Sequence, residues 1–177
     1  VVEDPVFLLE SNEWEKLAEN RNIQQIPSKY VLCFELVPHI DFQNVIDSLK
    51  KQYNLPVIVL TMAINSTLKA EYVIRAAGPK EFIYLIKNAD AVISTSFHCA
   101  AFSIIFHKPI YSLLTTHAPT RIVELLETYG LERGLINNGK ATKYLVEPNQ
   151  WDLIDNKIFN GRAFSIDYLK SLERHFE

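Results

Sequence analysis

Four apolar segments that alternate with helical patterns constrain the fold of this chain more than any other feature. The apolar segments are rich in strand-forming residues and cover residues 30–34, 56–60, 91–93 and 109–113. Apolar residues recur at helical spacing in the segments 42–53, 79–89, 97–106, 120–129 and 165–176, whereas 61–77 has the pattern of a loop. Such alternation is typical of an α/β fold, a parallel sheet with helices on both faces. In such sheets ligands bind beyond the carboxyl ends of the strands.

The composition indicates one globular domain over residues 1–177 and excludes several classes of partner. With 48% hydrophobic residues the chain can bury a sizeable core, and a net charge of -3 argues against nucleic acid. No stretch approaches the roughly 20 apolar residues of a membrane span. Two cysteines, Cys33 and Cys99, give no disulfide framework and no metal spacing, so we expect free thiols and a cytoplasmic location. Because the chain begins at Val1 and not at methionine, we interpret it as part of a longer protein.

The junction after the third apolar segment carries the most specific chemistry. Three hydroxyl residues, Ser94, Thr95 and Ser96, precede a helix that has His98 in its first turn. A helix start has unpaired N–H groups and a positive dipole end, so it attracts anions. An imidazole there can donate a proton or, when charged, hold an anion. The alternatives are an ordinary serine or threonine cap and a histidine bonded to a nearby carbonyl.

Three further residues are candidates for binding a substrate. Arg121 lies at the start of a helix, where a cation opposes the macrodipole unless an anion binds beside it. Gly78 allows close backbone approach, and Glu81 can accept a hydrogen bond from a sugar hydroxyl. A loop glycine and a favourable first-turn carboxylate are equally good readings of these last two residues.

The remaining histidines do not form a pattern that holds a metal. They are scattered as surface or structural residues, of which His117 adjoins the Arg121 loop: His39, His107, His117 and His175. The sequence also contains no phosphate-binding P-loop, no glycine-rich dinucleotide fingerprint and no nucleophile elbow. We therefore expect neither a metal nor a cofactor.

In these segments the chain resembles the polysaccharide pyruvyl transferase family. The family's ordered motifs correspond here to Gly78-Pro79-Lys80-Glu81-Phe82, Thr95-Ser96-Phe97-His98-Cys99-Ala100-Ala101-Phe102-Ser103, Lys108-Pro109 and Arg121-Ile122. Asp4-Pro5, followed by Leu8-Leu9 and Trp14, resembles the start of the family's second domain. The resemblance spans residues 1 to about 135.

The resemblance implies a Rossmann-like domain, the carboxyl-terminal, donor-side half of a two-domain enzyme of GT-B type. It implies transfer of pyruvate from phosphoenolpyruvate to two hydroxyls of a sugar or lipid-linked oligosaccharide, forming a ketal in surface polysaccharide (exopolysaccharide or capsule) synthesis. By analogy His98 is the general acid or a phosphate-holding cation, and Arg121 with Ser94, Thr95 and Ser96 clamps the anion. The missing amino-terminal domain would supply the acceptor side, so we expect the isolated chain to be inactive.

The chain departs from the family pattern at four positions. Thr95 stands where many members have an aspartate, Cys99 and Ala100 stand where they have Gly-Thr, and Ser96 stands where other branches have an arginine. Two other functions therefore stay open: half of a nucleotide-sugar glycosyltransferase of the same architecture, and a non-catalytic domain that binds anions or sugars.

Overall fold

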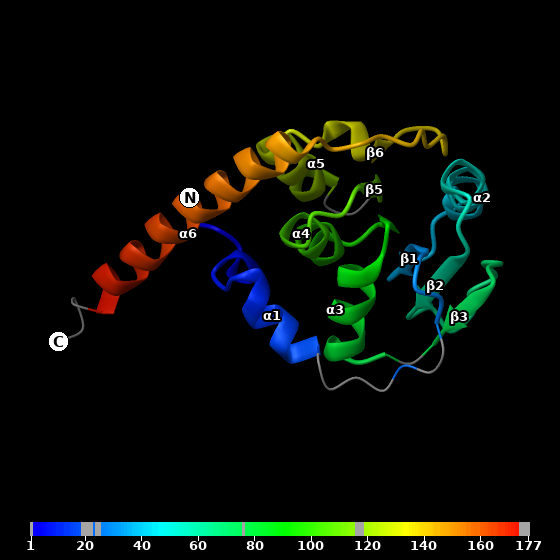
Figure 1. The fold of residues 1–177 in the computed structure, drawn as a ribbon, viewed down its shortest axis with the longest axis horizontal. Coiled ribbons are helices and arrows are strands. Elements are labelled where there is room, and N and C mark those ends of the chain that lie inside the picture. The colour runs from blue at the N-terminus through cyan, green and yellow to red at the C-terminus, as the bar shows by residue number, and fades with distance from the viewer. Residues whose placement is uncertain (1, 19–22, 24–25, 76, 116–118, 174–177) are drawn as a thin grey trace.

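Six parallel strands form a single sheet in the order β3-β2-β1-β4-β5-β6 (Figure 1). The computed structural model describes residues 2–18, 23, 26–75, 77–115 and 119–173. The strands are β1 (Val31–Glu35), β2 (Val57–Thr61), β3 (Tyr72–Ile74), β4 (Ala91–Ser94), β5 (Ile110–Leu113) and β6 (Leu135–Ile136). The fold is α/β and Rossmann-like, which confirms the prediction from the sequence.

In the described ranges, six α-helices lie around this sheet. They are α1 (Ser11–Ala18), α2 (Phe42–Tyr53), α3 (Pro79–Asn88), α4 (Phe97–Ile105), α5 (Pro119–Tyr129) and α6 (Pro148–Glu173), with two 3-10 turns, η1 (Pro5–Phe7) and η2 (Glu132–Gly134). α6 extends past the body of the molecule at its carboxyl-terminal end (Figure 1). None of the helices in the described ranges combines the length and apolar character needed to cross a bilayer.

Strand alternation divides the core into two layers. On β1, Val31 and Cys33 belong to the layer that contains the apolar side of α2, whereas Leu32 and Phe34 belong to the layer of α3, α4 and α5. Successive side chains of a strand point to opposite faces, so covering both faces favours apolar residues at most positions. The strands therefore read as continuous apolar runs.

Two elements differ from the sequence-based expectation. β3 lies within the segment 61–77, which was expected to be a loop. The strand is short and leaves Tyr72 and Val73 exposed at the sheet edge, so its sequence does not resemble that of a buried strand. α6 begins 17 residues before the expected helix start at 165, and its buried residues Ile154 and Ile158 precede that segment. Leu169 and Leu172, two of the apolar residues at helical spacing in the expected helix, are 45% and 41% exposed.

The strand order places a ligand crevice between β1 and β4. The chain runs outward from β1 through β2 to β3, then crosses to β4 and runs outward in the opposite direction. Loops that leave β1 and β4 thus part from each other at their carboxyl ends. In open parallel sheets this switch point is where ligands bind.

Candidate functional site

A cavity of about 590 Å³ opens at the switch point between β1 and β4. Its walls come from residues 36–40 after β1, 95–98 after β4, and 114, 115, 121 and 122 after β5. His98, Arg121, Thr95 and Ser96 therefore line one cavity, although they come from two separate loops. This arrangement agrees with the sequence argument that both loops lie at the carboxyl edge of the sheet.

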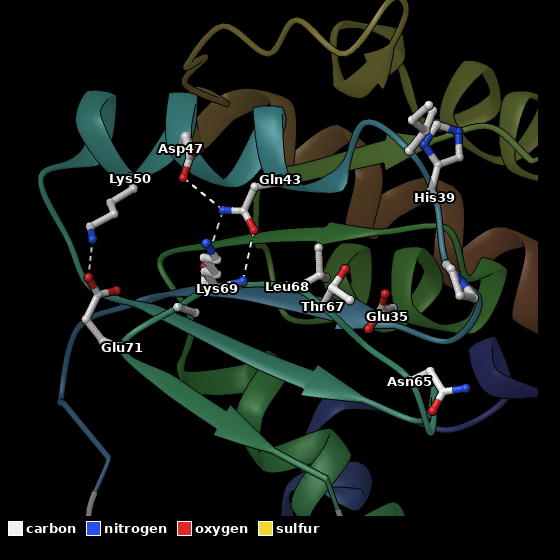
Figure 2. A pocket seen from close by; sticks show the side chains of 13 residues that line it. Glu35, His39, Gln43, Asp47, Lys50, Asn65, Thr67, Leu68, Lys69 and Glu71 are labelled. Atoms are coloured by element: carbon white, nitrogen blue, oxygen red, sulfur yellow. Dashed lines mark hydrogen bonds and ion pairs between the residues drawn. The ribbon is translucent and has the colours of Figure 1, made fainter.

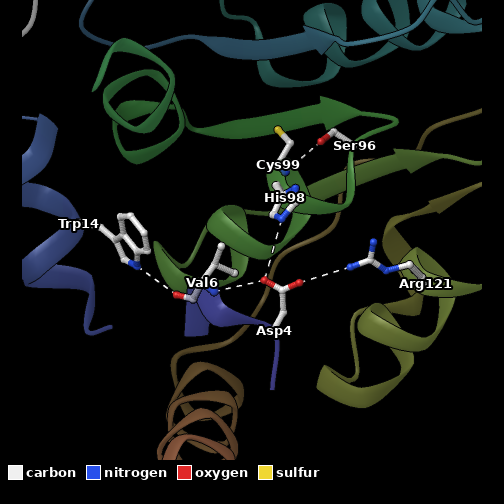
Figure 3. Close-up of polar contacts among 7 residues, drawn as sticks. All are labelled: Asp4, Val6, Trp14, Ser96, His98, Cys99 and Arg121. Atoms are coloured by element: carbon white, nitrogen blue, oxygen red, sulfur yellow. Dashed lines mark hydrogen bonds and ion pairs between the residues drawn. The ribbon is translucent and has the colours of Figure 1, made fainter. Parts of the chain in front are cut away.

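The side chains of His98 and Arg121 converge on one carboxylate, that of Asp4 (Figure 3). His98 Nε2 lies 4.0 Å from Asp4 Oδ1, and Arg121 Nη2 donates a hydrogen bond to Asp4 Oδ2 at 3.3 Å. The histidine and arginine side chains are each 55% exposed, whereas the aspartate side chain is 17% exposed. The guanidinium and imidazole thus form a preassembled pair beside a carboxylate.

Asp4 is held in place by the turn that follows it. Its Oδ1 accepts a hydrogen bond from the Val6 N–H at 3.2 Å, which caps η1. The Val6 carbonyl in turn accepts a hydrogen bond from Trp14 Nε1 at 3.1 Å (Figure 3). The Trp14 ring packs edge-on against Phe102 of α4. The carboxylate is therefore fixed relative to the same helix that carries His98.

Arg121 is positioned by an aromatic ring as well as by Asp4. Its guanidinium carbon lies 4.1 Å from the centroid of the Phe97 ring, a cation–π geometry. Within the described residues, the hydrogen bond that Arg121 makes uses Nη2 alone. Its other N–H groups remain for a ligand anion.

The three hydroxyls before α4 have different surroundings. Ser96 is the N-cap, and its Oγ accepts a hydrogen bond from the Cys99 N–H at 3.4 Å. Ser94 is fully buried, donating to the Phe34 carbonyl at 3.1 Å and accepting from the Ser96 N–H at 3.0 Å. These hydrogen bonds stabilise the turn between β4 and α4. Ser94 itself does not line the cavity, so it positions the site residues and does not contact a ligand there.

Thr95 is the exception among the three. Its side chain is 7% exposed and its Oγ1 has no hydrogen-bond partner among the described atoms. A buried hydroxyl without a partner costs free energy and marks a position where a partner is missing. Of the three hydroxyl residues, Thr95 has the clearest capacity to bind something further.

Gly78 and Glu81 lie outside the lining of this cavity. Gly78 is the N-cap of α3, and its N–H donates to Glu81 Oε2 at 3.0 Å, as in a capping box. Their local geometry is that of a helix start, the ordinary reading of the two residues. Their predicted role in binding stays a prediction.

The other described histidines contact backbone or carboxylate groups. His39 lies at the cavity wall, where Nδ1 accepts from the Asp41 N–H and Nε2 lies 3.2 Å from the Leu114 carbonyl. His107, near the other end of α4, bonds Asp155 Oδ1 at 2.8 Å. His117 and His175 lie outside the described residues. Within the described ranges, no group of three metal-ligating side chains comes together.

Asp4 is the functional candidate that the sequence did not reveal. It lies 117 residues from Arg121, and no local pattern predicts that contact. The one sequence feature at this position is the Asp4-Pro5 pair. It is typical of a capped turn and does not indicate that Asp4 belongs to a functional site. The complete arrangement has two cationic or ionisable groups, one carboxylate and a helix start around an open cavity.

Comparison with known proteins identifies a family for this chain. A search of curated proteins finds no match. Residues 1–117 match the sequence profile described as polysaccharide pyruvyl transferase, a segment that includes Asp4, β1 to β5 and His98. Because this match covers more than half of the 177 residues, the chain belongs to the polysaccharide pyruvyl transferase family.

Proposed function

We propose that this chain is the donor-binding domain of a transferase that moves pyruvate from phosphoenolpyruvate to a sugar diol. One observation carries the proposal: His98 and Arg121 both line the switch-point cavity and both contact the carboxylate of Asp4. Two groups that can hold anions, beside the start of α4, suit a small ligand that carries both phosphate and carboxylate.

Each of these groups has a role in the proposed reaction. Arg121 and the N–H groups at the start of α4 hold the donor anion. His98 gives a proton to the methylene carbon of the enol, which leaves C2 electron-poor. One sugar hydroxyl adds to C2 and its proton restores His98; the second hydroxyl displaces the phosphate, which takes up the other hydroxyl proton. Asp4 stabilises the positive charge that develops at C2 between these steps.

The proposal extends to the architecture of the whole enzyme. The Rossmann-like sheet and its switch-point cavity match what is expected of the carboxyl-terminal half of a GT-B enzyme. An amino-terminal half would then face this cavity and contribute to the acceptor side. The acceptor is a sugar or lipid-linked oligosaccharide of a surface polysaccharide. A cytoplasmic location is part of the proposal, and the two buried free thiols support it.

Calorimetric titration with phosphoenolpyruvate tests the proposal directly. Loss of a hydrogen-bonded ion pair to a ligand costs about 1.5–3 kcal/mol, so we expect Arg121→Ala to bind about 10- to 100-fold more weakly. His98→Ala should also weaken binding. Arg133→Ala is the matched control, because Arg133 also lies over an aromatic ring, that of Tyr144, and is outside the cavity lining.

The outcomes separate the candidate functions. Tighter binding of UDP-glucose than of phosphoenolpyruvate, lost in the same variants, would indicate a nucleotide-sugar glycosyltransferase. Absence of binding of either probe would indicate a non-catalytic domain. Equal affinities in the wild type and Arg121→Ala would contradict the proposed clamp.

A further inference from the structure

A second cavity, of about 910 Å³, lies beside the first on the α2 side of the sheet (Figure 2). Its lining comes from the end of β1, the face of α2 and the loop 65–71. The two cavities share Pro38, His39 and Ile40 in their walls. The proposed donor clamp uses none of the groups on the α2 side, so their chemistry needs a separate explanation.

A buried carboxylate, that of Glu35, lines this cavity. Glu35 is the last residue of β1 and is 3% exposed. Its Oε2 accepts a hydrogen bond from Thr61 Oγ1 at 2.6 Å, the one bond to this carboxylate found within the described residues. A buried carboxylate usually has several donors or a cation beside it. Further donors from a ligand would therefore stabilise Glu35.

Glu35 belongs to a row of polar residues at the end of the sheet. Glu35 on β1 is in register with Thr61 on β2. On the other side of β1, Phe34 is in register with Ser94 of β4. Thr95, the next residue after Ser94, therefore lies level with Glu35. Strand alternation places Glu35 and Thr61 on the α2 face, where Cys33 and Val59 are buried. Thr95 continues this row beyond the end of β4, and its hydroxyl has no partner in the described structure. The row therefore connects the two cavities, because Glu35 lines the second cavity and Thr95 lines the first.

The surrounding groups favour a neutral ligand with hydroxyl groups. Lys50 is paired with Glu71, and Gln43 bonds both the backbone of Lys69 and the carboxylate of Asp47 (Figure 2). Carboxylate oxygens accept hydrogen bonds, so Glu35 and Asp47 suit hydroxyl donors. Together with Glu71 they outnumber the lysines of the lining, Lys50 and Lys69, which disfavours an anion. The apolar side chains of Ile40 and Leu68 also line the cavity and can cover the carbon face of a ring.

We propose that the second cavity binds a diol of a neutral sugar, with the Glu35 carboxylate accepting hydrogen bonds from its hydroxyls. Its assignment as the acceptor side rests on the proposed transferase function, because the shared wall would place the sugar beside the donor. Binding of the sugar itself is independent of that function. Glu35 is thus assigned as the specificity-determining residue for the hydroxylated substrate.

Titration with methyl galactopyranoside, followed by backbone amide chemical shifts, tests the site in the protein as it stands. We expect shifts at Glu35, Thr61 and the loop 65–71. Glu35→Gln keeps the shape and an oxygen for the Thr61 hydroxyl, but it removes the charge, so binding should weaken about tenfold. Asp152→Asn, on exposed α6, is the matched control and should leave the affinity unchanged.

Several outcomes would overturn the proposal. They are binding that Glu35→Gln leaves unchanged, wild-type shifts confined to other surfaces, equal binding of the fully O-methylated sugar, or tighter binding of a cationic probe such as choline. The wild-type shift map decides the question even if Glu35→Gln fails to fold. Sugar binding together with no binding of phosphoenolpyruvate would refute the transferase function and leave this site standing.

Discussion

Substitution of Asp4 by asparagine should make the protein bind phosphoenolpyruvate more tightly. Asp4 lies between His98 and Arg121, where its negative charge opposes an incoming anion. Asparagine has the same shape, and its side-chain oxygen can still accept the hydrogen bond from Val6 N–H that caps η1. Phe97 still holds the guanidinium of Arg121 by its cation–π contact. The change therefore removes one charge and leaves the site assembled.

The expected gain follows from the exposure of the site. Two unit charges about 4 Å apart interact by about 1 kcal/mol in water and about 4 kcal/mol at an effective dielectric constant of 20. With side-chain exposures of 55% for His98 and Arg121, the site lies near the aqueous limit. We expect about 1 kcal/mol, which lowers Kd about fivefold. In about 1 M salt, screening should remove most of this gain.

Isothermal titration of the wild type, Asp4→Asn and Asp155→Asn at low and high salt measures this effect. Asp155→Asn is the matched control, since it removes one charge beside His107, near the opposite end of α4. Weaker binding by Asp4→Asn would refute the reasoning and show that the carboxylate acts mainly by positioning Arg121. A gain that persists unchanged at high salt would also refute its electrostatic origin.

Three further predictions follow from the contacts around the sheet. Ser96→Ala removes the N-cap of α4 and should lower stability by about 1 kcal/mol and Tm by about 2–4 °C in thermal unfolding, whereas Ser96→Asp should retain the cap; equal Tm values for wild type and Ser96→Ala would contradict it. Hydrogen bonds from Lys50 and the Val57 N–H hold the pKa of Glu71 below its ordinary 4.5, so its contribution to stability is present above about pH 4.5 and is lost as the pH falls through the lowered pKa. Denaturant titrations should therefore show Glu71→Gln less stable than the wild type at pH 7 and nearly equal to it in acid, and a difference independent of pH would contradict this. Burial raises the pKa of the Cys99 thiol to about 12 and also raises the pKa of the Cys33 thiol. Iodoacetamide at pH 8 should therefore modify neither thiol until the protein is unfolded. Rapid labelling of the folded protein would contradict this and show that the core is open.

The sheet could be predicted because its central strands are covered on both faces. Val57–Thr61 buries every residue, and its first four positions are apolar, which gives the run that the sequence shows. β3 was not predicted, because its apolar run of three residues, Tyr72–Ile74, stands between the charged Glu71 and Arg75 in a polar segment. The long α6 buries few side chains, among them Ile154 and Ile158, so most of its sequence carries no apolar period.

The candidate site could be predicted in part for a related reason. His98 and Arg121 follow β4 and β5, and the carboxyl ends of neighbouring parallel strands meet at one edge of the sheet. Their common cavity is thus a consequence of topology. Asp4 and Glu35 depend on contacts across the fold, and Glu35 also ends an otherwise apolar strand. Tertiary packing alone shows what these two carboxylates face.

The segment that carries Asp4 is held by residues beyond the part of the chain that matches the family. Arg162 of α6 donates hydrogen bonds to the carbonyls of Phe7 at 2.9 Å and Leu9 at 3.0 Å. Ser165 Oγ accepts from the Glu3 N–H at 2.9 Å. A Cβ added at Gly161 would lie 2.2 Å from Glu3 Oε1, so a larger residue there would have to displace the Glu3 side chain. α6 therefore fixes the segment on both sides of Asp4, and the carboxylate between the imidazole and the guanidinium depends on a helix that lines no part of that cavity.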